Sequence, residues 1–181
     1  MNINCIDRYP ELQKAFDTIN AHILDARVNL GTEVFHFVSS LTPIVNVDLL
    51  IKNELGETLL TWRSDELYGP PYGPGWHLPG GVVRYKEDPK IRVPKVALSE
   101  LGCEVMFEET PLTVTSQISD TRVVRGHFIS LLYRCVATTP PKNENKADKN
   151  DPLNGQWFWH RHAPEKLLPA HETFRTFINE R

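Results

Sequence analysis

The apolar positions near the N-terminus follow the period of an amphipathic helix. They recur at intervals of three and four residues between Tyr9 and Ala26, and again between Thr32 and Leu41. This spacing places apolar side chains on one side of a helix. We therefore predict two helices in an N-terminal extension over residues 1–41. We favour packing over the rest of the chain, or contact with a second copy of it, above a role in substrate binding. The apolar positions are Leu12, Phe16, Ile19, Ile23, Val34, Phe37 and Val38.

From residue 43 onward the pattern changes to short apolar runs, which are typical of strands. A turn at Gly56 separates the first two runs, so we expect a hairpin. The segment over residues 139–151 is almost free of apolar residues and predicts a mobile surface loop. We expect strands over residues 43–53, 58–63, 103–107, 112–118 and 123–138, a short helix over residues 163–168, and a final helix over residues 171–181.

The stretch from Trp76 to Gly102 contains the most informative sequence. An apolar run ends in Pro79-Gly80-Gly81, a short loop follows, and a segment of helical composition begins at Asp88-Pro89. Adjacent glycines allow the backbone to approach a ligand closely and to take φ values that other residues avoid. Pro94 falls within the predicted helix, where it should introduce a kink or delay the start of the helix.

Glu100 lies near the end of this predicted helix, from which its carboxylate can face the two glycines. A carboxylate and the backbone carbonyl of Gly80 are hard oxygen ligands, and Mg²⁺ prefers such ligands with water and phosphate completing its shell. The pattern therefore predicts an Mg²⁺ site, with Mn²⁺ as an alternative. Many ordinary strand-to-helix connections also contain glycine, so a purely structural role is the other interpretation.

Two further polar residues stand out in the first hairpin. Asp48 is the one acid in an apolar strand, and burial of a carboxylate is costly unless it has a partner. It is either a functional acid or a residue on the open side of an edge strand. Arg63 closes the second strand, and a guanidinium suits phosphate through paired hydrogen bonds and permanent charge. A solvated arginine at the end of a strand is the alternative.

Other candidates lie in the loops and in the later strands. Tyr72 belongs to a segment rich in Gly and Pro, and its ring could stack on a base or simply pack at the surface. Arg84 and Arg125, with Arg122, are candidate phosphate-binding cations. His127 lies in a strand and is either catalytic or structural. His160 and His162 have an ordinary pKa that suits a base near neutral pH, and the alternative is that they are surface residues.

Composition and charge narrow the possible functions. The chain has 181 residues, 40% of them apolar, which suits one domain over residues 42–181 after the N-terminal extension. A net charge of −3 provides no overall attraction to nucleic acid or to an anionic membrane, and no apolar run is long enough to cross a bilayer. The three cysteines, Cys5, Cys103 and Cys135, lack the spacing of a zinc site and fit a reducing cytoplasm.

The spacing around the two glycines resembles the Nudix box, a motif of the Nudix hydrolase superfamily. Gly81, Glu87, Glu100 and Gly102 are in register with the first Gly, first Glu, last Glu and last Gly of that motif, and Trp76-His77-Leu78-Pro79 resembles the usual approach to it. The resemblance implies an α/β fold, a Nudix-like α/β/α sandwich with a mixed, partly antiparallel sheet. The departures are Lys95, Val96 and Ser99, which replace an Arg and two Glu.

The reduced box is similar to that of the GDP-mannose mannosyl hydrolase branch, which also keeps only the last Glu. The resemblance implies a divalent metal held by Glu100 and Gly80, with Glu87 as a further candidate ligand. It also implies a catalytic Asp48, contact of Arg63 with a diphosphate, and alignment of His127 with a family His.

Phe128 replaces a family Tyr in this branch, and Leu153 and Asn154 occupy the positions of a metal-binding Gln and the proposed basic His. Either another group, such as Asp48, His160 or His162, therefore activates the water, or the activity differs. The implied substrate is a nucleotide sugar, cleaved at the sugar C1–O bond to release a nucleoside diphosphate. Cleavage of a phosphoanhydride bond and a catalytically silent nucleotide-binding module remain the alternatives.

Overall fold

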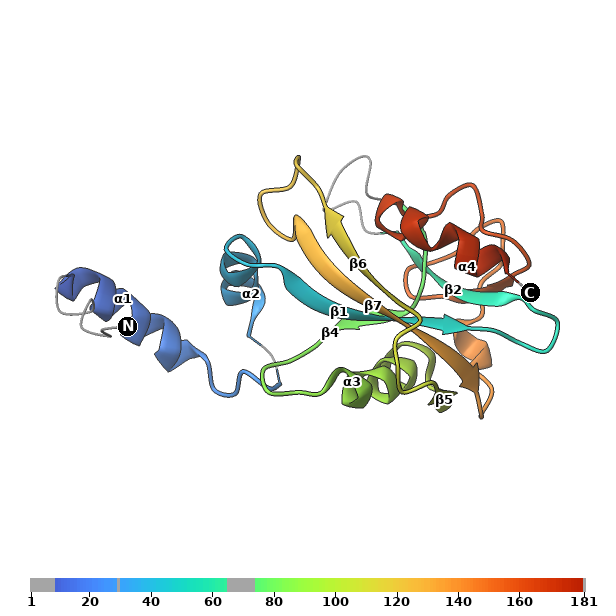
Figure 1. The fold of residues 1–181 in the computed structure, drawn as a ribbon, viewed down its shortest axis with the longest axis horizontal. Coiled ribbons are helices and arrows are strands. Elements are labelled where there is room, and N and C mark those ends of the chain that lie inside the picture. The colour runs from blue at the N-terminus through green and yellow to red at the C-terminus, as the bar shows by residue number, and fades with distance from the viewer. Residues whose placement is uncertain (1–8, 29, 65–73, 181) are drawn as a thin grey trace.

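The computed structural model describes residues 9–28, 30–64 and 74–180, and its strands form two sheets (Figure 1). The larger, mixed sheet has the order β4-β1-β7-β5, with β6 also paired to β7. The smaller sheet has the order β3-β2-β8 and is antiparallel throughout. The strands are β1 (Ile44–Ile51), β2 (Thr58–Arg63), β3 (Gly75–His77), β4 (Gly80–Val82), β5 (Val105–Phe107), β6 (Thr113–Ile118), β7 (His127–Ala137) and β8 (Trp157–His160).

The helices lie on both sides of the larger sheet. In Figure 1, α3 lies along one side of this sheet, whereas α4 lies on the other side with the smaller sheet. The predicted α/β/α sandwich with a mixed, partly antiparallel sheet is therefore confirmed. The helices are α1 (Pro10–His22), α2 (Thr32–Ser39), α3 (Pro89–Val96) and α4 (Arg175–Asn179), with the short helical turns η2 (Ala97–Leu101), η3 (Asn143–Asn145) and η4 (Pro169–Phe174).

β1 contributes buried side chains to both faces of the larger sheet. It runs parallel to β7 and antiparallel to β4, and its side chains alternate between the two faces of the sheet. Val47, Leu49 and Ile51 are completely buried against the α3 side. Leu50 is completely buried in a second apolar cluster on the opposite side, and by the same alternation Asp48 also faces that side.

Proline does not delay the predicted central helix. Asp88 caps α3 by accepting a hydrogen bond from the Lys90 backbone N–H, and Pro89 occupies the first turn. Pro94 lies inside α3, and three residues later the helix widens into the π-helical turn η2. Glu100 lies on this turn, which ends at Gly102 with φ 64° in the left-handed region. The wide turn, rather than an ideal α-helix, therefore sets the direction of the Glu100 side chain.

The two N-terminal helices, α1 and α2, differ in how they pack against the rest of the chain. None of the α1 residues is buried, and Leu12 and Phe16 are 51% and 45% exposed. Figure 1 shows α1 extending away from the sheets, whereas α2 lies beside the N-terminal end of β1. The amphipathic pattern of α1 is present, but its apolar side does not pack over the rest of the described chain. Contact with a second copy remains a prediction.

One local prediction near the C-terminus is wrong. Residues 163–168 form a turn and a bridge to Trp76 instead of a helix, because Trp76 N–H donates to Lys166 O (2.7 Å) and Leu168 N–H donates to Trp76 O (2.8 Å). Residues 139–151 form a mostly exposed loop, as predicted, and this loop has anchors to the body: Ala147 is buried, and Trp157 Nε1 donates to Lys142 O (3.0 Å).

The structure also shows the state of two cysteines and the character of the helices. Cys103 and Cys135 are free thiols buried in the apolar cluster beside α3. Among residues 9–28, 30–64 and 74–180, no helix combines the length and apolar character that a bilayer crossing requires.

Candidate functional site

A cleft of about 510 Å³ opens where β1, β2, β4 and the β6–β7 connection meet the C-terminal turn η4. It brings together Asp48, Arg63, Gly80 and Arg125, which the sequence predicts as site residues. It also contains residues to which the sequence assigns no role, among them Asn46, His77, Gln117 and His171.

Asp48 lies at the base of the cleft and is only 3% exposed. Ser130 Oγ donates a short hydrogen bond to its Oδ2 atom, and Asn46 Nδ2 donates to its Oδ1 atom (3.1 Å). Burial raises the pKa of Asp48 to about 6, although both hydrogen bonds and the Arg63 charge act to lower it. The predicted lone acid therefore has partners, and they come from its own strand and from β7.

Gly80 makes the position of this carboxylate possible. It lies opposite Asp48 in the antiparallel pairing of β4 with β1. A Cβ atom on Gly80 would overlap Asp48 Oδ1 and lie 2.9 Å from Val47 O. Neither Gly80 nor Gly81 has a positive φ, and both belong to a strand. Part of the prediction is therefore corrected, because these glycines provide close approach but not an unusual backbone conformation.

Glu100 is a second carboxylate beside the cleft: it is not among the residues that line it, but it interacts with Asp48, Arg63 and the Gly80 backbone. It is partly buried, and burial raises its pKa to about 7, while Arg63 and a hydrogen bond from the Gly80 backbone lower it. The Asp48 charge raises the pKa of Glu100 further, so the two carboxylates interact. Two interacting carboxylates are costly to ionise together without a cation beside them.

The donor set fits a hard divalent cation. Two carboxylates and a backbone oxygen are ligands that suit Mg²⁺, which keeps several waters and binds ligand phosphate. Within the described ranges, no three His, Cys, Asp or Glu side chains are grouped so as to hold a metal. Asp48 and Glu100, with the carbonyl of Gly80, are the residues that would hold one ion.

Arg63 supplies the central positive charge. It ends β2, lines the cleft, and lowers the pKa of both Asp48 and Glu100. Its charge also disfavours protonation of the neighbouring His77 and His171. A permanent cation beside two carboxylates and two neutral imidazoles is suited to an anionic ligand such as diphosphate.

The two histidines of the cleft are neutral near pH 7. Burial lowers the pKa of His77 to about 3 and that of His171 well below its ordinary value. His77 Nδ1 donates to Leu78 O (2.8 Å), and His171 Nδ1 accepts from Leu78 N–H (3.3 Å). His171 therefore carries its proton on Nε2. His77 belongs to the approach to the glycines, whereas nothing in the local sequence signals that His171 reaches this site.

Glu87 is occupied by other contacts. Its carboxylate accepts hydrogen bonds from Arg92 Nε (2.8 Å), Lys95 Nζ (2.8 Å) and Arg84 N–H (3.0 Å). Burial alone would raise the pKa of Glu87, but these donors outweigh it and lower the pKa to about 2. Glu87 is not among the residues that line the cleft. Its role as a metal ligand remains a prediction, and its present contacts hold the loop to α3.

The other predicted residues lie away from the cleft or outside the described residues. Arg84 is held beside Glu87 and Arg92 and does not line the cleft. His127 Nε2 contacts Ser116 Oγ (3.0 Å) at the end of the β6–β7 pairing, and its neighbour Phe128 lines the cleft instead. Tyr72 falls outside the described residues.

His160, one candidate base, and the two residues at the family's Gln and His positions lie outside the cleft lining. His160 is buried against Trp76, with 4.5 Å between ring centroids, and burial lowers its pKa to about 4. Asn154 Oδ1 accepts from Ser64 N–H (3.1 Å) and so ties the end of β2 to the loop before β8. Leu153 is exposed.

Comparison with known proteins identifies the domain. The family model described as NUDIX domain matches residues 42–179. The chain is also similar to the low-salt glycan biosynthesis protein Agl8 of Haloferax volcanii, with 34% identity over 95 residues, 50% of this chain and 57% of the relative. The matched segment thus spans little more than half of that relative's length.

Solved structures share the fold at low sequence identity. The MutT protein from Methanosarcina mazei Go1 has a TM-score of 0.55 and 21% identity over 77% of this chain and 95% of its own. An ADP-ribose pyrophosphatase from Streptococcus suis 89-1591 has a TM-score of 0.52 and 15% identity, over 76% of this chain and 87% of its own.

Proposed function

The chain belongs to the NUDIX family of hydrolases, and from this premise we propose that it hydrolyses a nucleoside diphosphate linked to a second moiety. The proposed substrate class is a nucleotide sugar of the GDP-mannose type, with Mg²⁺ or Mn²⁺ as cofactor. The observation that carries the proposal is that Asp48 and Arg63 line one cleft and that the Glu100 carboxylate, beside it, interacts with both of them and with the Gly80 backbone. The similarity to a glycan biosynthesis protein supports a substrate that contains a sugar.

The cation would neutralise negative charge on the diphosphate as the leaving group forms. Asp48 and Glu100, with the Gly80 carbonyl, are the residues proposed to hold it. Their raised pKa values support this role, because a bound cation compensates the cost of ionising both groups. Val96 is buried and apolar, so the carboxylate cluster of an ordinary Nudix helix is reduced to one member in this helix.

The protein's own cations would bind the diphosphate. Arg63 and Arg125 line the cleft from different elements, so they can contact one ligand from two sides. Asp48 would orient the sugar or the attacking water, because its carboxylate is fixed by Ser130 and Asn46. His171 would offer a neutral Nε2–H donor to the ligand.

The proposed bond cleavage is at the sugar C1–O bond, which releases the nucleoside diphosphate. Hydrolysis in H₂¹⁸O distinguishes the alternatives, since C–O cleavage places the label in the sugar and P–O cleavage places it in a phosphate. Label recovered only in phosphate would replace the proposed reaction with phosphoanhydride hydrolysis.

A screen of nucleotide sugars and dinucleotides with Mg²⁺ and with Mn²⁺, followed by product identification, tests the activity itself. Binding of GDP-mannose by calorimetry without turnover at any concentration of either cation would favour a silent binding module. We propose a cytoplasmic location on the basis of the two buried free thiols, Cys103 and Cys135.

A further inference from the structure

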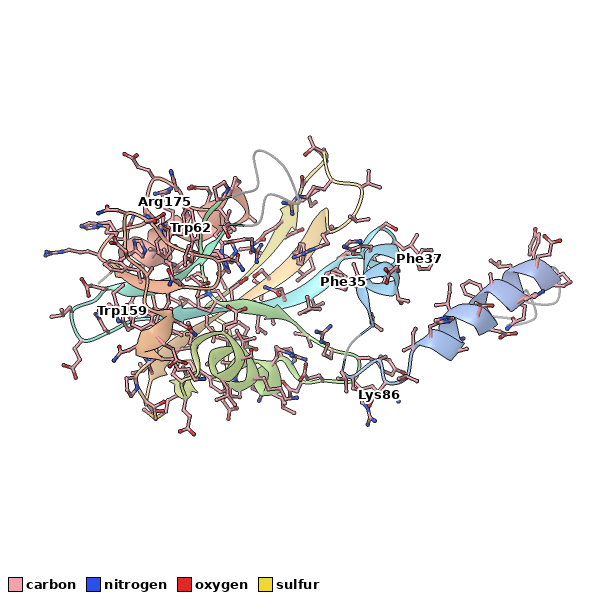
Figure 2. The ribbon with its side chains drawn as sticks, turned by 180° about the vertical axis from the view of Figure 1, so that it is seen from behind. Phe35, Phe37, Trp62, Lys86, Trp159 and Arg175 are labelled. Carbon is pink, nitrogen blue, oxygen red and sulfur yellow. The ribbon has the colours of Figure 1, made fainter. Side chains whose placement is uncertain are left out.

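The N-terminal helix α2 reaches the cleft through Arg125. The Arg125 guanidinium carbon lies 5.8 Å from the ring centroid of Phe35 on α2 and 5.8 Å from that of Phe128 on β7. Figure 2 shows Phe35 on the side of α2 that faces the sheet and Phe37 on the side turned away. Arg125 and Phe128 both line the cleft, so Phe35 contacts a cleft residue from outside the matched NUDIX domain.

A second contact from α2 holds the backbone of the same arginine. Arg125 N–H donates to Ser39 Oγ (3.2 Å), and the buried Ser39 hydroxyl donates to His36 O (2.9 Å). Arg125 has a φ of 55°, a left-handed conformation that is costly for a residue with a side chain. The hydrogen bond from α2 therefore stabilises an unfavourable backbone conformation.

The turn that carries Arg125 is tightly closed. Ser119 N–H donates to Gly126 O (2.7 Å), and a Cβ on Gly126 would lie 2.7 Å from Arg122 O. The backbone near Arg125 thus has little room to adjust. Contacts to its ring neighbours and to Ser39 fix both the main chain and the side chain of one cleft cation.

We propose that α2 is a positioning element of the binding site, which holds Arg125 ready for the diphosphate of the substrate. This inference rests on the proposed function, because it takes the ligand to be anionic. It assigns α2 a role in substrate binding, which the sequence pattern alone did not favour. The physical gain is preorganisation: a side chain that is already ordered loses less entropy when a ligand binds.

Substitution of the stacking ring tests the proposal. Phe35→Leu keeps an apolar side chain but removes the π-system, whereas Phe35→Trp keeps an aromatic face. Binding of inorganic pyrophosphate is measured by calorimetry with Mg²⁺ present. We expect Phe35→Leu to weaken this binding by about fivefold and Phe35→Trp to retain the affinity of the unsubstituted protein. With the substrate found by the screen, KM should rise while kcat is retained. Phe37→Leu is the control on the same helix, since Phe37 is exposed.

The neighbouring serines provide an independent test. Ser39→Ala removes the acceptor for Arg125 N–H, whereas Ser40→Ala removes a hydroxyl that donates back to α2, at Phe37 O (2.7 Å). We expect Ser39→Ala to weaken pyrophosphate binding several-fold and Ser40→Ala to leave it unchanged.

Arg125→Ala separates failure of this inference from failure of the proposed function. If Arg125→Ala weakens pyrophosphate binding but Phe35→Leu and Ser39→Ala do not, the positioning role of α2 is overturned. If Arg125→Ala has no effect either, the cleft does not bind diphosphate through this residue, and the inference fails together with the binding scheme beneath it. Circular dichroism and melting curves establish that each variant is folded.

Discussion

Gly80 lies directly opposite Asp48 across the β1–β4 pairing, and the Asp48 carboxylate occupies the space that a side chain on Gly80 would need. The glycine and the acid thus form one structural unit of the site, although 32 positions separate them in the sequence (80 − 48). This relationship explains why β4 begins with a glycine, which would otherwise reduce the stability of a strand.

The first prediction follows from this pairing. Gly80→Ala should displace the Asp48 carboxylate and lower kcat by about 10²-fold or more, because a misplaced catalytic group loses its alignment. Gly81→Ala is the comparison, since its Cβ would meet a methyl group of Val96 at 2.7 Å, on the α3 side. Its cost should fall on stability, by about 1–3 kcal/mol. Equal kcat values for the two folded variants would refute the role of Gly80.

The second prediction concerns the two carboxylates. Glu100→Gln and Asp48→Asn should each weaken binding of Mg²⁺ or Mn²⁺, because an amide oxygen is a poorer ligand than a carboxylate. Mn²⁺ binding can be followed by electron paramagnetic resonance, and turnover by product analysis. Glu100→Gln with unchanged cation affinity and unchanged turnover would contradict the metal site as described.

The third prediction distinguishes Glu87 from Glu100. Glu87→Gln leaves Arg92 and Lys95 without their anionic partner, so we expect a stability loss of about 2–3 kcal/mol in chemical denaturation. Cation affinity should be retained. The pKa of Glu87 in the folded protein, about 2, lies below its ordinary value of 4.5, so its stabilising contribution is present above pH 4.5 and is lost as pH falls toward 2. A loss of cation affinity as large as that of Glu100→Gln would instead make Glu87 a ligand.

The arrangement of these groups also shows where sequence reasoning succeeds. Apolar periodicity predicts β1, β2 and the start of α3 because those elements depend on local burial and capping. Asp48 stands out because a charged residue in an apolar strand needs a partner. Arg63 and Glu100 follow from strand-end and box positions; Arg63 lines the cleft, and Glu100 interacts with Arg63 and the Gly80 backbone beside it.

The missing parts depend on long-range contacts. Ser130 meets Asp48 only through the parallel register of β1 with β7, and His171 meets Leu78 only because η4 packs beside β3. No local pattern encodes either contact. The helix predicted over residues 163–168 is wrong for the same reason, since the backbone of Lys166 and Leu168 pairs with Trp76 rather than within a helix. Tertiary contacts outweighed local propensity there.

The fourth prediction is that Asp48 and Glu100 make the protein less stable as pH rises, whereas Glu87 makes it more stable. The pKa values of Asp48 and Glu100 in the folded protein, about 6 and about 7, lie above their ordinary values of 3.8 and 4.5. The folded state therefore binds more protons than the unfolded state between about pH 4 and pH 7, and without divalent cation these groups reduce stability as pH rises through that range. For the buried Asp48, ionisation lowers the free energy of unfolding by about 3 kcal/mol.

Added Mg²⁺ should offset this loss, because it binds the ionised carboxylates. The increase in Tm with Mg²⁺ should therefore grow from pH 5 to pH 8 in thermal melts of the full chain. Asp48→Asn should reduce the dependence of Tm on pH in the absence of Mg²⁺. A Tm increase with Mg²⁺ that is independent of pH would argue against ionised Asp48 and Glu100 as its ligands.

The fifth prediction concerns the two histidines of the cleft. Burial and the Arg63 charge hold His77 and His171 neutral, with the pKa of His77 at about 3 and that of His171 well below its ordinary value. Neither ring should titrate between pH 5 and pH 8, and each should keep a fixed tautomer through its contact with Leu78. Imidazole resonances followed by NMR test this directly, with His77→Gln and His171→Asn used to assign the two signals.

The same reasoning predicts the consequence for activity. His171→Asn should reduce turnover modestly, by about tenfold, through loss of a neutral donor, without removing an ionisation from the pH profile of kcat. His171→Phe should cost more stability than His171→Asn, because the Leu78 N–H then loses its acceptor in a buried position. A titration of His171 near pH 6.5 that disappears together with one limb of the pH profile would instead identify this residue as the general base, since a neutral ring that does not exchange its proton in that range cannot produce that limb.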